Sequence, residues 1–175
     1  MNPVDVKPAL VAIVASALSL SAFAQANLPL PPDRLATALP TATWSDVTRG
    51  KVETASDTVP IKRSSAKVTF EGKRGSTDPF RATFTINDEG AYGAQMYGYG
   101  ADYLKKDVKD GTQRSMVLPG GRRALYTSYT NDSMGLETFV ADRFVVSTSC
   151  MKSTEAKCVE AFSKWDFKAV EAIKP

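Results

Sequence analysis

The sequence contains no histidine, and this absence removes several classes of enzyme at once. Ser-His-Asp and Cys-His catalysis both use an imidazole as the general base. Zinc sites built on histidine ligands are excluded for the same reason. Any enzyme made from this sequence would depend on carboxylates, lysine, tyrosine or an unusual serine. We therefore expect no catalytic residue, no metal and no cofactor.

Cysteine is almost as scarce, because Cys150 and Cys158 are the only two in the chain. Two cysteines this close in sequence are expected to pair in an oxidising compartment. The bond would pin the start of a helix to the end of a strand. The alternative is a pair of free, buried thiols. A redox-active pair is disfavoured because the C-x-x-C spacing is not present.

Neither sign of charge is in large excess. The formal net charge is +3, and acidic and basic residues are well mixed along the chain. A dedicated nucleic-acid binder usually concentrates basic residues on one face. We therefore expect no nucleic-acid partner.

The one long apolar run lies at the N-terminus. Ala9–Ala24 follows a short segment with Lys7 and precedes Ala24-Gln25-Ala26. This is the layout of a bacterial-type secretory signal peptide, residues 1–26, with cleavage after Ala26 and with Ala24 as the second choice. The alternative is a retained membrane anchor, but the run is shorter than the ~20 residues a membrane-spanning helix needs. We expect a mature form that does not span the membrane and is periplasmic or secreted.

The mature chain, residues 27–175, has the length of a single domain. We divide that domain into an N-terminal extended or short helical segment, 27–60, and a sheet region, 61–175. Prolines favour an extended start, and Asp33–Leu39 is expected to form one or two helical turns. Lys51–Pro60 is interpreted as a polar connector.

The rest of the chain alternates short apolar-rich runs with turn clusters, as in an antiparallel meander. Val145 beside Val146 suggests a strand buried on both faces, whereas Asp132 and Gly135 are assigned to a turn. The predicted strands are Ala66–Phe70, Phe80–Ile86, Arg114–Leu118, Ala124–Thr130, Leu136–Ala141 and Phe144–Ser149.

After the last strand, the apolar period becomes helical. Cys158, Phe162 and Trp165 share one face, so we predict a helix from about Thr154 to Trp165, followed by a short helical turn in Asp166–Ile173. The predicted fold class is α+β. An antiparallel sheet of about six to seven strands packs against a C-terminal α-helix, and a short helix lies near the N-terminus.

Ala91–Tyr103 is rich in tyrosine and glycine. Tyrosine combines a flat apolar ring with a polar tip, which suits a binding platform for a saccharide, a peptide or a partner protein. The alternative is a strand weakened by glycine, whose tyrosines pack across the sheet. Four of the six tyrosines lie here: Tyr92, Tyr97, Tyr99 and Tyr103.

Two other groups of residues are candidates for chemistry. Arg122 and Arg123 follow Gly120-Gly121, a pattern that can hold an anion with backbone N–H groups and guanidinium groups; the alternative is a hairpin turn with solvated arginines. Asp132, Glu137 and Asp142 are candidates for a pair of catalytic carboxylates, although aspartate is common in turns for structural reasons.

The C-terminal stretch ADRFVVSTSC…CVEAFSKWDFKAV resembles the close of PsbP-like small α/β domains. Those domains end in a long strand, a helix and a short tail with the pattern D-φ-x-x-φ, where φ is apolar. The resemblance covers about a third of the chain. It implies an antiparallel sheet covered by helices, without a catalytic centre. The cysteine pair and the Tyr/Gly segment depart from the pattern, and no functional residue is transferred.

These observations favour a non-catalytic binding or accessory protein whose partner is another envelope or secreted protein, as for an inhibitor or an immunity-type protein. One alternative is a periplasmic small-ligand or glycan-binding protein that uses the four tyrosines together with Arg122 and Arg123. A second alternative is a carboxylate-dependent cell-wall hydrolase, which requires two acidic residues facing one cleft. No feature of the sequence sets an oligomeric state.

Overall fold

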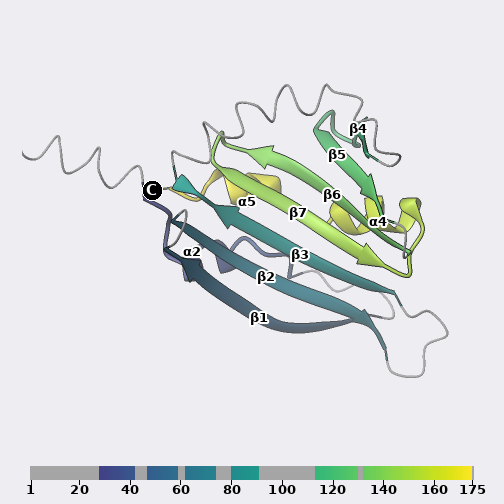
Figure 1. The fold of residues 1–175 in the computed structure, drawn as a ribbon, viewed down its shortest axis with the longest axis horizontal. Helices are drawn as coiled ribbons and strands as arrows, with labels where there is room; N and C mark the ends of the chain where they lie inside the picture. Colours follow the sequence, from purple (N-terminus) through teal and green to yellow (C-terminus); the bar gives the residue numbers. More distant parts are fainter. Residues whose placement is uncertain are drawn as a thin grey trace, which may run out of the picture.

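A seven-stranded antiparallel sheet dominates the computed structural model (Figure 1). The structure describes residues 28–41, 47–58, 62–73, 80–90, 113–129 and 132–174. The strands are β1 (Val47–Asp57), β2 (Arg63–Gly72), β3 (Arg81–Asp88), β4 (Gln113–Val117), β5 (Arg123–Ser128), β6 (Ser133–Val140) and β7 (Phe144–Met151). This confirms the predicted antiparallel sheet of about six to seven strands.

The sheet is built from two meanders that meet at its centre. The strand order is β1-β2-β3-β7-β6-β5-β4, so β3 of the first meander pairs with β7 of the second. Among the described strands, β1 and β4 form the two edges. The last strand in the chain therefore lies in the middle of the sheet, where neighbours on both sides satisfy its backbone groups.

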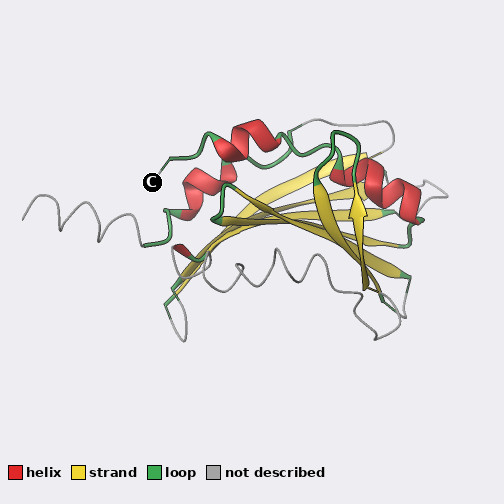
Figure 2. Cartoon of the chain, turned by 90° about the horizontal axis from the view of Figure 1, so that it is seen from above, coloured by secondary structure: helices red, strands yellow, loops and turns green. Residues whose placement is uncertain are grey.

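In the described part of the chain, three helices lie on one side of this sheet (Figure 2). They are α2 (Pro32–Ala36), α4 (Glu155–Phe162) and α5 (Phe167–Glu171). Proline starts α2, where its missing N–H costs nothing. The side chains of Thr154 and Asp166 accept backbone N–H groups at the starts of α4 and α5, which supplies the acceptors that a helix start lacks.

The alternation read from the sequence is present in the strands. In β3, Ala82, Phe84 and Ile86 are buried while the residues between them are half-buried. Val145 and Val146 are both buried, on opposite faces of β7, as the sequence predicts. The helix-side face of the sheet is thus apolar and the other face is largely polar.

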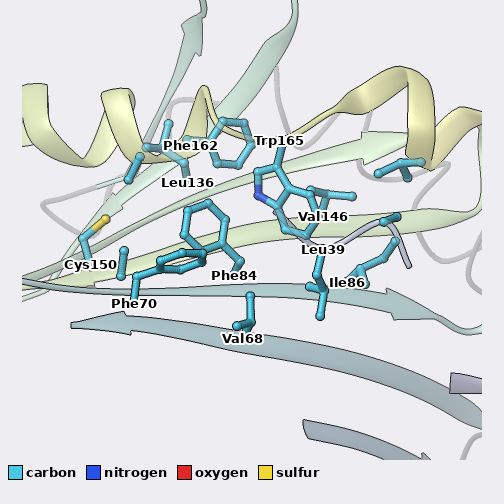
Figure 3. Close-up of a cluster of buried hydrophobic side chains, with 14 of the residues drawn as sticks. Leu39, Val68, Phe70, Phe84, Ile86, Leu136, Val146, Cys150, Phe162 and Trp165 are labelled. Atoms are coloured by element: carbon cyan, nitrogen blue, oxygen red, sulfur yellow. The ribbon is translucent and has the colours of Figure 1, made fainter. Parts of the chain in front are cut away.

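The core lies between the helix-side face and the helices (Figure 3). Phe84 is at its centre, with its ring centroid 5.3 Å from Phe70 and 5.7 Å from Trp165, both edge-on. The indole N–H of Trp165 donates to the Thr148 hydroxyl at 3.0 Å, so neither buried polar group is left unsatisfied. Beside this cluster, Cys150 of β7 and Cys158 of α4 form the predicted disulfide.

The prediction of a polar connector over Lys51–Pro60 is wrong, because most of that stretch belongs to strand β1. Strand β1 is an edge strand whose side chains are almost all exposed, so it carries no apolar alternation to reveal it. Its register shifts between Arg49 and Val52. Gly50 lies within this irregularity, and a Cβ there would be only 2.9 Å from the backbone oxygen of Thr69.

The prediction of a turn at Gly135 is also wrong, because Gly135 lies inside strand β6. The turn before β6 contains Asp132 in a left-handed conformation, with φ at 54°. Aspartate tolerates that conformation because its side chain is short and polar. The turn therefore forms at Asp132, without a contribution from Gly135. The backbone of Gly135 pairs with Ser149 of β7 and Thr127 of β5.

Candidate functional site

The four tyrosines predicted as a platform, Tyr92, Tyr97, Tyr99 and Tyr103, lie outside the described residues. Their role stays a prediction. The two arginines predicted with them are both described and lie at the β4–β5 hairpin.

This hairpin is closed by two backbone hydrogen bonds between Leu118 and the residues that follow it. Gly120 and Gly121 both have positive φ, 91° and 82°, a conformation that side chains disfavour. Because both residues are glycines, the turn has no side chains at these two positions. It places Arg122 beside helix α5 and Arg123 at the start of β5.

Arg122 is engaged by α5. Its guanidinium lies 4.3 Å from the ring centroid of Phe167 and forms an ion pair with Glu171 at 2.7 Å. Arg123 is exposed, and the burial of the next residue, Ala124, in the core places Arg123 on the opposite face of the sheet by strand alternation. The two guanidinium groups thus serve different surfaces, although both residues border a shallow hollow of about 390 Å³ with Thr138 and Phe139.

A groove of about 430 Å³ lies between this hairpin and the α4–α5 turn. Its apolar lining comes from Leu118, Val159, Phe162, Trp165 and Phe167. Charged residues from both walls surround the apolar part: Arg122, Asp166, Lys168 and Glu171. Its volume is within the ~300–1,000 Å³ range of ligand pockets. An apolar floor within a charged rim is the composition of a recognition site.

The three candidate carboxylates do not converge. Asp132 and Asp142 lie in the turns at the two ends of β6, and Glu137 lies between them within the strand. At ~3.4 Å per residue, the ends of β6 at Ser133 and Val140 are about 14 and about 10 Å from Glu137, and the two aspartates lie beyond those ends. Carboxylate pairs of glycosidases lie ~5–9.5 Å apart. These three residues therefore do not form such a pair.

Glu137 nevertheless has a distinctive environment. The residue keeps contact with solvent, and on the sheet face away from the helices it pairs with Leu125 of β5 and Ser147 of β7. Incomplete hydration raises the pKa of this carboxyl above its ordinary value of 4.5, and repulsion from Glu89 raises it further. Loss of a proton here is thus harder than at an ordinary surface glutamate.

Sequence reasoning missed the ion pair between Asp88 and Arg143. Asp88 is the last residue of β3, is completely buried and lies 2.9 Å from the Arg143 guanidinium. The two residues are 55 positions apart, so no local pattern links them. The pair holds the N-terminal segment to the sheet, because Leu30 N–H donates to Asp88 and Arg143 donates to the carbonyl of Leu28.

No protein-family model, curated protein or solved structure matches this chain. The resemblance to PsbP-like domains accordingly stays a prediction. Within the described ranges, no group of three or more Cys, Asp or Glu side chains is placed to hold a metal ion. None of the helices in the same ranges is long and apolar enough to cross a membrane.

Proposed function

We propose that this chain is a non-catalytic binding protein that works outside the cytoplasm and holds another envelope protein. The proposal includes a signal peptide cleaved after Ala26 and a mature chain in the periplasm or beyond the cell. The Cys150–Cys158 disulfide is compatible with this location, because such bonds persist in oxidising compartments.

The observation that carries the proposal is the groove between the β4–β5 hairpin and the α4–α5 turn. Half-buried apolar side chains, Val159 and Phe167, line it beside the fully buried Phe162. In this proposal the buried side of the C-terminal helices covers the sheet, and their outer ends form one wall of the groove. A partner residue that filled the groove would remove this apolar surface from water.

The groove has room for one anchoring side chain of a partner, and it is too small to form a whole protein–protein interface. Binding energy at protein interfaces is concentrated in a few residues that fill such pockets. The charged rim then sets orientation and association rate, since rim charges act mainly on specificity and on-rate. We therefore infer a partner with an apolar or aromatic anchor residue that enters beside Arg122.

The first experiment is native mass spectrometry of the mature protein purified from the envelope fraction. We expect a protein partner in stoichiometric amount. Its affinity is then measured for Val159→Asp, which places a charge within the groove, and for Val52→Asp, the same change on the exposed edge strand β1. The expected result is binding at least tenfold weaker for Val159→Asp and unchanged for Val52→Asp.

A second pair of variants keeps the proposal testable if Val159→Asp fails to fold. Lys168→Glu reverses a charge at the rim, and Lys157→Glu makes the same reversal on α4 outside the groove. The proposal predicts slower association and altered salt dependence for Lys168→Glu alone. Equal affinities for all four variants, or a protein that purifies with no partner, would contradict it.

A further inference from the structure

The sheet face turned away from the helices of the described chain (Figure 2) carries a row of small hydroxyl side chains on neighbouring strands. Paired positions across β2, β3 and β7 place Thr69 beside Thr83 and Thr83 beside Ser149. The hydroxyls of Thr69 and Thr83 are 3.0 Å apart. The same face continues through Gly135 of β6 to Thr127 of β5.

Gly135 creates a depression in this face. It is the one position in that row without a side chain, and it is flanked by Thr127 and Ser149 on the neighbouring strands. Strands are ~4.8 Å apart, so the two flanking side chains lie about 10 Å apart with an open floor between them. The depression has a volume of about 300 Å³.

A second row of side chains closes one end of the depression. Two residues along β6 from Gly135, Glu137 pairs with Leu125 on one side and Ser147 on the other. Tyr129, which is 55% exposed, borders the depression from the end of β5. Gln113 of β4 completes the polar lining. The site is thus built from four strands and not from a loop.

The charged residues of the lining determine which ligand charge the depression favours. Among the described residues that line the depression, none is a lysine or arginine, and Glu137 repels an anion, so these residues disfavour an anionic ligand. Hydroxyl side chains both donate and accept hydrogen bonds, which matches a ligand whose own groups do both. An exposed tyrosine ring adds a flat apolar surface that can stack on a small ring.

We propose that the depression over Gly135 binds a single neutral saccharide ring, with hydrogen bonds to Thr127, Ser147 and Ser149 and stacking on Tyr129. The volume suits one ring and not an oligosaccharide, since it is at the small end of ligand pockets. This site is separate from the groove beside α4 and α5 and does not depend on a protein partner there.

Amide chemical-shift titration of the mature protein tests the proposal with four single-ring sugars. The probes are glucose and N-acetylglucosamine, which are neutral, glucosamine, which is cationic, and glucuronate, which is anionic. We expect saturable shifts at Thr127, Gly135 and Ser149 with a neutral probe and weaker binding of glucuronate. Tightest binding of glucosamine would overturn the neutral-ligand assignment.

Variants then test whether binding requires the depression or another part of the same sheet face. Gly135→Val fills the floor and should abolish the shifts. Gly135→Ala is the milder version, because its Cβ would make only an ordinary 3.7 Å contact with the Thr148 backbone oxygen. Thr127→Val should weaken binding about three- to tenfold, as expected for the loss of one hydrogen bond. Thr85→Val removes a hydroxyl of the same face outside the depression and should change nothing.

Three results would each overturn the inference. They are the absence of shifts with every probe, shifts confined to residues of the α4–α5 groove, and a Gly135→Val protein with the fold and affinity of the unmodified chain. If Gly135→Val fails to fold, the comparison of Thr127→Val with Thr85→Val decides, and equal affinities for those two variants would contradict the site.

Discussion

The buried ion pair between Asp88 and Arg143 should be the most sensitive polar point of the fold. Asp88 is 0% exposed and Arg143 only 12%. The carboxylate accepts from Arg143 Nε at 3.0 and 3.1 Å and from Nη2 at 2.9 Å. It also accepts the backbone N–H groups of Leu30 and Gly90, each at 2.8 Å. One side chain therefore joins the end of β3, the β6–β7 turn and the N-terminal segment.

The perturbation is Asp88→Ala, which removes the carboxylate that a buried guanidinium faces. Breaking a buried pair from one side typically costs ~3–5 kcal/mol, because the remaining charge stays desolvated. The matched control is Asp57→Ala, which breaks the pair with Arg63, where both side chains are about half exposed. Exposed pairs contribute ~0–1 kcal/mol. We therefore expect a difference of about 3 kcal/mol between the two variants.

Urea unfolding monitored by tryptophan fluorescence measures both values, since Trp165 is buried in the core. The denaturant dependence should be the same in each variant if two-state unfolding holds. Asp88→Leu combined with Arg143→Met replaces both charges with apolar groups. This double variant should recover part of the loss, because removing both partners avoids the isolated buried charge. A loss for Asp88→Ala within about 1 kcal/mol of that for Asp57→Ala would refute the reasoning.

Two further outcomes follow from the structure. Replacing Cys150 and Cys158 with serine opens a loop of sequence separation 8 and should lower the free energy of unfolding by about 2.5 kcal/mol on the chain-entropy model; an unchanged urea midpoint would contradict this. Glu137 has a pKa raised in the folded state, so the folded protein keeps that proton longer and its stability falls as pH rises above the ordinary carboxyl value. Glu137→Gln should therefore stabilise the protein more at about pH 7 than at about pH 3.5, and a gain independent of pH would contradict the shift.

Much of the fold could be read from local patterns. Phe84 and its neighbours in β3 alternate, and so do Leu136, Thr138 and Val140 in β6, because successive side chains of a strand point to opposite faces. The disulfide was predictable because short spacing alone brings two cysteines together. The start of a helix near Thr154 was predictable because the change to a helical apolar period is a local feature.

Other features were decided only by tertiary structure. Strand β1 carries no apolar alternation, so only its pairing with β2 makes it a strand. Gly135 resembled a turn residue, and only its neighbours Thr127 and Ser149 turn it into the floor of a depression. In both cases the deciding contacts are with a neighbouring strand, outside the few residues that a local pattern covers.

The candidate sites show the same division. The Gly120-Gly121 turn and Arg122 were recognisable from the sequence, because positive φ and a guanidinium are local properties. That Arg122 lies on Phe167 and pairs with Glu171 depends on where α5 lies. The sequence by itself determined which stretches alternate, turn or begin a helix, since those depend on the nearest residues along the chain. The tertiary structure alone decided which charges are buried and which polar side chains share a surface, because burial and proximity depend on packing between distant segments.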